Sequence, residues 1–192
     1  MEFSPSEQPD ALYRTMTSLV VPRPIAWIST VDGDGHPNLA PYSYFNAVSS
    51  RPPVVMFSGG IRDGEPKDTP TNALETGEFV TNLVTQDVIE AMDKTSASVE
   101  GDEFEFAGVT PEPARTVTPA RVAEAHAQFE CTVRDSMTVG SSTLVLGDVE
   151  HIHVDEALLT DGKVDTRKVD AVGRLGGSYY TGIDILEFER TY

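Results

Sequence analysis

A polar and aromatic run between two apolar stretches has the residue types of a ligand site. Its members are Tyr42, Ser43, Tyr44, Phe45, Asn46, Ser49, Ser50 and Arg51. Aromatic faces stack on flat rings, amides and hydroxyls bond to polar edges, and an arginine binds anions. We therefore predict a ligand with a flat ring, hydrogen-bonding edges and an anionic tail. The alternative is a bend with core aromatic residues and turn-forming serines.

The run KDTPTN places a cation and hydroxyl groups at the start of a predicted helix. We expect Thr69 as its N-cap, Pro70 as its first residue and Gly77 as its stop. A helix N-terminus presents free amides and a positive dipole end, which favour an anion. Lys67, Thr69 and Asn72 are therefore candidate anion ligands. The alternative is a capped surface helix with a solvated lysine.

Four further residues are candidates because they lie near these runs. The chain has only 14 Lys and Arg residues, so the cations near these runs stand out as possible partners of an anion: Arg23, Arg51 and Lys67. Asn38 follows a turn and is either a turn residue or a ligand donor. The run GRLGGSYY lacks the GxGxxG spacing of a dinucleotide fold. Its glycines instead allow close backbone approach, with Arg174 or Tyr179 facing a cleft.

No motif for acid–base, nucleophilic or metal catalysis is present. The sequence contains no GxSxG, Walker or HExxH pattern, which argues against the commonest hydrolases and NTPases. His151 and His153 share a strand face, but no further ligands at a metal-binding spacing accompany them. We therefore expect no metal site and no catalytic side chain.

The composition excludes some partners. Asp and Glu number 31 against 14 Lys and Arg, a formal net charge of −17, so nucleic-acid binding is not expected. The acidity fits either an ordinary acidic protein or one from a high-salt cytoplasm. The single cysteine, Cys131, excludes an internal disulfide. With no signal peptide and no membrane-length apolar stretch, we expect a cytoplasmic protein away from membranes.

Strand patterns dominate the rest of the chain. We expect helices in DTPTNALETG and TQDVIEAMDK, the second capped by Thr85, and a surface loop over 98–122 that covers a site or packs on a second subunit. Strands are expected at 19–31, 54–57, 79–84, 127–134, 143–154 and 183–188. These features predict one mainly β domain over 1–192 with a few short helices, closed as a barrel.

The segment RPIAWIST…DG…PNLAPYSYFNAVSSRPPVVMFS resembles the flavin reductase-like family of FMN-binding split-barrel proteins, of the flavoredoxin type. KDTPTNALETGEFVTNLV resembles the phosphate-side helix of that family, GSSTLVLGDVEHIHVDE its late strands and AVGRLGGSYYT its C-terminal signature. The resemblance implies an FMN-binding split β-barrel and a homodimer with FMN near the subunit interface. It also suggests that His153 lies close to the flavin or nicotinamide.

The resemblance also implies an activity. Residues 43–46 would position the flavin ring, Lys67 and Thr69 would hold the phosphate, and Arg23 or Arg174 would offset negative charge. The protein would pass reducing equivalents from NADH or NADPH to flavin, and could supply a partner monooxygenase. Hydride transfer needs stacking and favourable electrostatics rather than an acid or base. Two alternatives are a flavoredoxin-type FMN electron carrier and a cofactor-free β-barrel interaction protein.

Overall fold

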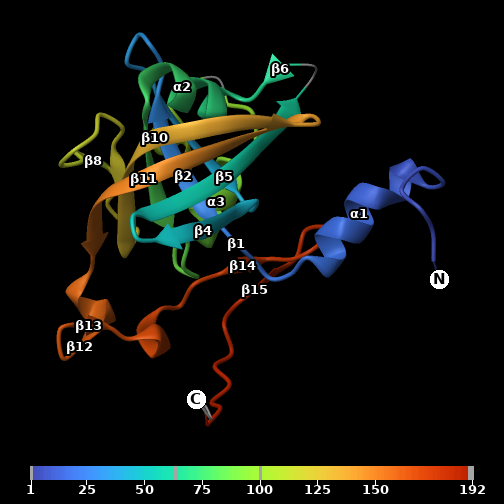
Figure 1. Ribbon diagram of the computed structural model, residues 1–192. Coiled ribbons are helices and arrows are strands. Elements are labelled where there is room, and N and C mark those ends of the chain that lie inside the picture. Colours follow the sequence, from blue (N-terminus) through green and yellow to red (C-terminus); the bar gives the residue numbers. More distant parts are fainter. Residues whose placement is uncertain (1, 63–64, 100, 190–192) are drawn as a thin grey trace.

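The computed structural model describes residues 2–62, 65–99 and 101–189, which fold mainly as β-structure, as predicted (Figure 1). The strands are β1 Arg23–Pro24, β2 Ala26–Val31, β3 Pro37–Tyr42, β4 Phe45–Ser50, β5 Pro53–Arg62, β6 Glu65–Pro66, β7 Glu78–Leu83, β8 Pro111–Glu112, β9 Arg121–Val122, β10 Ala127–Val139, β11 Ser142–Val154, β12 Leu159–Thr160, β13 Lys163–Val164, β14 Gly173–Arg174 and β15 Tyr180–Thr181. The helices are α1 Pro9–Leu19, α2 Asp68–Thr76, α3 Ile89–Lys94 and α4 Glu103–Ala107, with short 3₁₀ turns Glu156–Leu158 and Thr166–Lys168.

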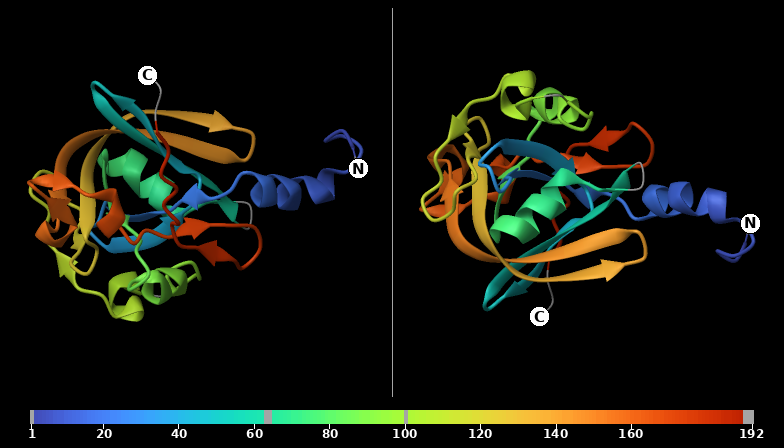
Figure 2. Two further views of the ribbon diagram at one scale, coloured as in Figure 1. Left: turned by 90° about the horizontal axis from the view of Figure 1, so that it is seen from below. Right: turned by 90° about the horizontal axis from the view of Figure 1, so that it is seen from above.

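The main sheet is antiparallel and curled. Its strands follow the order β3-β2-β7-β10-β11-β5-β4, and β6 pairs with β5. Seen along its axis, the sheet curves around α2 (Figure 2). A smaller sheet of β1, β14 and β15 lies outside it, at the point where both ends of the chain leave the body. No helix in the described ranges is long and apolar enough to cross a membrane.

Two apolar clusters meet at β2, which explains why this strand is buried on both faces. Inside the curled sheet, Phe57 lies 5.3 Å from Tyr42 and 5.2 Å from Phe79, measured between ring centroids. On the outer face, Trp27 packs with residues that α3 and α4 supply, including Met92. Alternate residues of a strand point to opposite faces, so a continuous apolar run suits a strand covered on both sides.

The predicted helices exist, but their starts were wrong. The helix in DTPTNALETG does end at Gly77, which takes the left-handed conformation with φ of 78°. Its N-cap is Lys67, and Pro70 is its third residue. Thr69 is not the cap, because its hydroxyl lies in a buried network described below. The second helix begins at Ile89, and Thr85 bonds to the Asp87 carboxylate instead of capping it.

Two strand predictions need correction. Residues 19–31 do not form one strand: α1 ends at Leu19, the chain bends, and β1 and β2 follow. Helix α1 was not predicted from the sequence. Its first residue is Pro9, and a proline at that position was the available signal. Residues 183–188 form no strand and join no sheet in the described part of the chain. Their apolar pattern suits a strand, but no neighbouring strand pairs with them.

Candidate functional site

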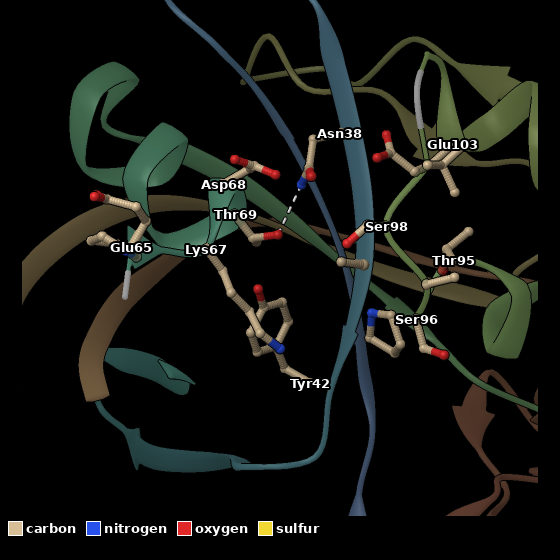
Figure 3. Close-up of a pocket in the computed structure, with 15 residues that line it drawn as sticks. Asn38, Tyr42, Glu65, Lys67, Asp68, Thr69, Thr95, Ser96, Ser98 and Glu103 are labelled. Carbon is tan, nitrogen blue, oxygen red and sulfur yellow. Dashed lines mark hydrogen bonds between the residues drawn. The ribbon is translucent and has the colours of Figure 1, made fainter. Parts of the chain in front are cut away.

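A polar pocket of about 300 Å³ opens where α2 begins (Figure 3). We call it the α2 pocket. Three segments wall it: strand β3, the stretch from β6 into α2, and residues 95–99 after α3 together with Glu103 at the start of α4. The residues that line it are Asn38, Ala40, Pro41, Tyr42, Glu65, Pro66, Lys67, Asp68, Thr69, Thr95, Ser96, Ala97, Ser98, Val99 and Glu103. Segments far apart in the sequence therefore converge on one cavity.

A buried hydrogen-bond network forms one side of the pocket. The Asn38 Nδ2 atom donates to Thr69 Oγ1 at 2.8 Å and to Thr30 Oγ1 at 3.0 Å. Asn72 lies behind it, with its Nδ2 atom 3.4 Å from Thr30 Oγ1. Because Thr69 Oγ1 accepts from Asn38, its own proton is left to donate, and no acceptor for it is found within residues 2–62, 65–99 and 101–189. Thr69 is therefore a candidate hydrogen-bond donor to a ligand.

The charges around the pocket oppose one another. The Lys67 Nζ atom lies 5.5 Å from the centroid of the Tyr42 ring, beside the positive end of α2. Three carboxylates, those of Glu65, Asp68 and Glu103, also line the cavity. Burial raises the pKa of Glu103 above its usual value. An anion bound here would depend on Lys67, Thr69 and the α2 amides, and would be weakened by the carboxylates.

The chain between α3 and α4 forms the opposite wall, which sequence reasoning did not identify. Thr95 is fixed by two hydrogen bonds: it accepts from Trp27 Nε1 at 2.9 Å and donates to the Met92 carbonyl at 2.8 Å. Trp27 is thus a core residue that also holds the pocket wall. The available signal was the run TSAS directly after the second predicted helix, which brings Ser96 and Ser98 into the pocket.

The predicted run around β4 lies elsewhere. Most of β4 is exposed, and none of residues 43–51 lines the α2 pocket. Asn46 Oδ1 accepts from the Ala47 amide, and Ser49 Oγ accepts from the Arg51 amide, so both make local bonds. Tyr44 is 41% exposed. Phe45 faces an apolar groove instead, and Ser50 lies on the exposed part of the strand.

The remaining candidates gather at the small sheet. Arg23 is buried and donates to the Thr17, Val20 and Leu175 carbonyls at 2.7 to 3.0 Å, and to Ser43 Oγ at 3.3 Å. Arg174 stacks over the Tyr180 ring at 4.5 Å and donates to the Gly177 and Tyr179 carbonyls. The Tyr179 side chain is exposed. Both arginines therefore bind the chain itself, and neither they nor Tyr179 line the α2 pocket.

His153 belongs to a separate cluster around a buried carboxylate. Its Nε2 atom lies 2.5 Å from Oε1 of Glu130, which is completely buried. The Arg115 and Thr116 amides donate to the same carboxylate at 2.8 and 2.6 Å, and the Thr116 hydroxyl adds a bond of 2.5 Å. Burial alone would raise the pKa of Glu130, but these bonds outweigh it and lower the pKa to about 2. We call this the Glu130 cluster.

The arrangement favours binding over side-chain catalysis. The α2 pocket combines a cation, hydroxyl groups and a helix N-terminus with the aromatic ring of Tyr42, which suits a polar ligand with an anionic group. In the described ranges, no group of three or more His, Cys, Asp and Glu side chains could hold a metal ion. The reactive chemistry of such a site would come from its ligand.

Comparisons with known proteins agree with the fold. Residues 16–169 match the family described as "Flavin reductase like domain". An uncharacterized protein of Aquifex aeolicus is 42% identical over 94% of each chain. The structure of nitrilotriacetate monooxygenase component B from Bacillus cereus superposes with a TM-score of 0.94, at 32% identity over 99% of this chain and 98% of that one.

A third comparison identifies the architecture. A Shewanella frigidimarina protein with a split barrel domain superposes with a TM-score of 0.86, at 25% identity over the whole of both chains. The curled, incompletely closed main sheet is therefore a split β-barrel, as the sequence predicted. By the match over most of its length and by these relatives, the chain belongs to the flavin reductase-like family.

Proposed function

We propose that this protein binds FMN, reduces flavin with NADH or NADPH, and supplies reduced flavin to a monooxygenase. The observation that carries the proposal is the α2 pocket, where Lys67, the unused Thr69 proton and the α2 N-terminus face one polar cavity. The likeness to a monooxygenase component B supports the partner. FMN rather than FAD is proposed because one phosphate-binding segment, Lys67 to Asn72, accounts for the anion site.

The residues present fit the phosphate and ribityl chain of FMN. Lys67 would pair with the phosphate, Thr69 would donate its proton, and the first amides of α2 would donate as well. Hydroxyl groups of Ser96 and Ser98 suit the ribityl chain. At about 300 Å³ the cavity is at the lower end of the range for ligand pockets, so the flavin ring must extend beyond it.

When bound, FMN would accept a hydride from the nicotinamide and pass electrons on. The chain's own part is positioning and electrostatics. Asn38 holds Thr69 in one orientation through a 2.8 Å hydrogen bond, and Trp27 holds the opposite wall through Thr95. Fixed groups lose little entropy when they bind a ligand, which favours a constant ring position. No proton needs to leave a side chain in the hydride step.

We also propose a homodimer in which the exposed run 43–51 contacts the part of FMN that extends beyond the α2 pocket. In this arrangement the flavin ring would be contacted by Ser43, Tyr44, Phe45 and Asn46. These residues could belong to the copy that binds the phosphate or to the other copy. Arg23 would act indirectly, because its hydrogen bond to Ser43 Oγ fixes the start of that run.

Two spectroscopic measurements test the activity. The purified protein is titrated with FMN and with FAD, and flavin fluorescence gives both affinities. Anaerobic mixing with NADH and NADPH, in the presence of a hundredfold excess of free FMN, then follows flavin bleaching. A reductase bleaches the whole excess through repeated turnovers. Slow bleaching of bound flavin alone indicates an electron carrier, and absence of flavin binding indicates a cofactor-free barrel.

A further inference from the structure

An apolar groove of about 350 Å³ lies where the split barrel is open. The last β5–β11 pair joins Val54 and Asp148, so residues 149–154 of β11 have β10 as their neighbour on one side and no partner from β5 on the other. We call the cavity beside them the open-side groove. Its residues are Ile25, Ala26, Phe45, Thr81, Asn82, Leu83, Ala127, Phe129, Ile152, Val154, Leu158, Val164 and Val169.

The C-terminal segment 182–189 carries apolar side chains that its own chain leaves uncovered. Ile183 is 52% exposed, Ile185 46%, Leu186 75% and Phe188 80%. The segment follows β15 and extends away from the barrel, at the same end as the β12–β13 hairpin (Figure 1). So many large exposed apolar residues in one short segment mark a surface that binds another apolar surface.

One cation beside the groove is left to pair with a carboxylate of the segment. Asp184, Glu187 and Glu189 alternate with the apolar residues of the segment. Next to Val164 and Val169 of the groove, three cations alternate with Asp161, Asp165 and Asp170, so this stretch has no net charge. Arg167 is ion-paired with Asp165 at 2.7 Å, and Lys168 donates to the Leu159 carbonyl. Lys163 is exposed and has no salt bridge in the described part of the chain, so it can meet a carboxylate of the segment.

We propose that the C-terminal segment of one copy of this protein occupies the open-side groove of a second copy. The segment's apolar side chains would pack against groove residues such as Ile152, Val164 and Val169, with one of its carboxylates near Lys163. The segment leads away from its own barrel, so a second copy is the occupant that the geometry favours. Reciprocal exchange gives a two-fold symmetric interface. This inference rests on the proposed homodimer and specifies the segment that builds it.

The first experiment replaces the apolar side chains by L186D/F188D and measures the mass by light scattering across a dilution series. Both side chains are exposed in the single chain, so the folded monomer should keep its urea unfolding curve. The dimer should dissociate at least about 100-fold more readily, because each of two symmetric contacts loses a tenfold contribution or more. The matched control is V139D at the end of β10, where an exposed valine lies outside the groove.

A charge exchange tests the proposed pairing. E187K and K163E should each raise the dimer dissociation constant, and the double variant E187K/K163E should recover part of the loss. A monomeric wild-type protein overturns both this inference and the homodimer. A dimer that persists in L186D/F188D overturns this inference and leaves the homodimer standing. Loss of unfolding free energy in monomeric L186D/F188D means that the segment folds onto its own chain, which also overturns it. FMN titrations play no part in these outcomes.

Discussion

Two buried polar networks in this protein differ in where their donors point. Around Glu130, two backbone amides, a hydroxyl and an imidazole converge on one carboxylate inside the chain. In the α2 pocket, Asn38 orients Thr69, and the Thr69 proton and the Lys67 ammonium face a cavity. The donors of the Glu130 cluster meet an acceptor within the chain, whereas we propose that a ligand completes the α2 pocket.

This difference separates structural from binding roles for residues of similar chemistry. A buried carboxylate with four donors stabilises the fold and fixes loop 113–118 against β10. A buried donor without an internal acceptor stabilises the protein little until an acceptor arrives. Substitution in the Glu130 cluster should therefore change folding, and substitution in the α2 pocket should change affinity.

The largest effect is expected for E130A. Four donors lose their acceptor, and each unsatisfied buried donor costs about 1–3 kcal/mol, partly relieved as the loop relaxes. We expect the free energy of unfolding to fall by about 3 kcal/mol or more, measured by urea denaturation at pH 7. The FMN affinity of the protein that remains folded should change by less than about twofold, or about 0.4 kcal/mol.

The matched control is E150A. Glu150 lies on the neighbouring strand, and its carboxylate accepts from the Thr132 hydroxyl at an exposed position. Its removal should change the free energy of unfolding by no more than about 0.5 kcal/mol. Equal losses in E130A and E150A would contradict a special role for the buried carboxylate.

The second prediction concerns the free energy of unfolding at low pH. Glu130 has its pKa lowered from 4.5 to about 2, so its contribution to stability is complete above pH 4.5 and is lost as the pH falls towards 2. The difference in unfolding free energy between wild type and E130Q should therefore be constant from pH 7 to 5 and narrow below 4.5. A difference that stays constant down to pH 2.5 would mean that Glu130 titrates normally.

The third test removes two groups of the α2 pocket together, by K67A/T69A. Each loses a charged or hydroxyl hydrogen bond to the phosphate, so FMN affinity should fall at least about tenfold, which corresponds to about 1.4 kcal/mol. The unfolding free energy should fall by about 1 kcal/mol, through the lost Asn38–Thr69 bond rather than a lost helix cap.

The control for the pocket is K94A, a lysine in the last turn of α3 that does not line the cavity. It removes the same charge from the chain and should leave FMN affinity within about twofold. Unchanged affinity in K67A/T69A would place the phosphate elsewhere, and residues Ser49, Ser50 and Arg51 would be the next candidates.

The sequence predicted the parts of the fold that depend on local pattern. Strands over 79–84, 127–134 and 143–154 appear because their apolar residues follow the strand period, and Gly77 ends α2 as expected. The 183–188 prediction failed because a strand also needs a partner, which pattern alone does not supply. The prediction of Thr69 as the N-cap was wrong because its side chain accepts a tertiary hydrogen bond from Asn38, 31 residues away.

The sequence predicted the part of the site in which one short run contains both a cation and the start of a helix. Lys67 and Thr69 line the α2 pocket for this reason. The run TSAS supplies hydroxyl groups, but Thr95, Ser96 and Glu103 reach the same cavity only because α3 and α4 pack on β3, which is a tertiary contact. Arg23 looked like an anion ligand by type, yet its donors are used by backbone carbonyls of α1 and the C-terminal strands.

The smallest expected effect concerns the carboxylates that line the α2 pocket. E103Q removes one of three carboxylates that line the cavity and keeps the shape of the side chain. Because like charges repel weakly across a partly solvated site, FMN affinity should rise by about threefold, or about 0.6 kcal/mol, at pH 8. Fluorescence titration of wild type and variant measures the ratio. E105Q, on the same helix outside the pocket, is the control.

The pH dependence of that ratio identifies the group responsible. Burial raises the pKa of Glu103, so its charge is lost at a higher pH than that of an ordinary carboxylate. Once Glu103 is protonated, wild type resembles E103Q, and the affinity ratio should approach one as the pH falls. The phosphate's own titration affects both proteins equally and cancels in the ratio. A ratio that is independent of pH would show that Glu103 acts through shape and not through charge.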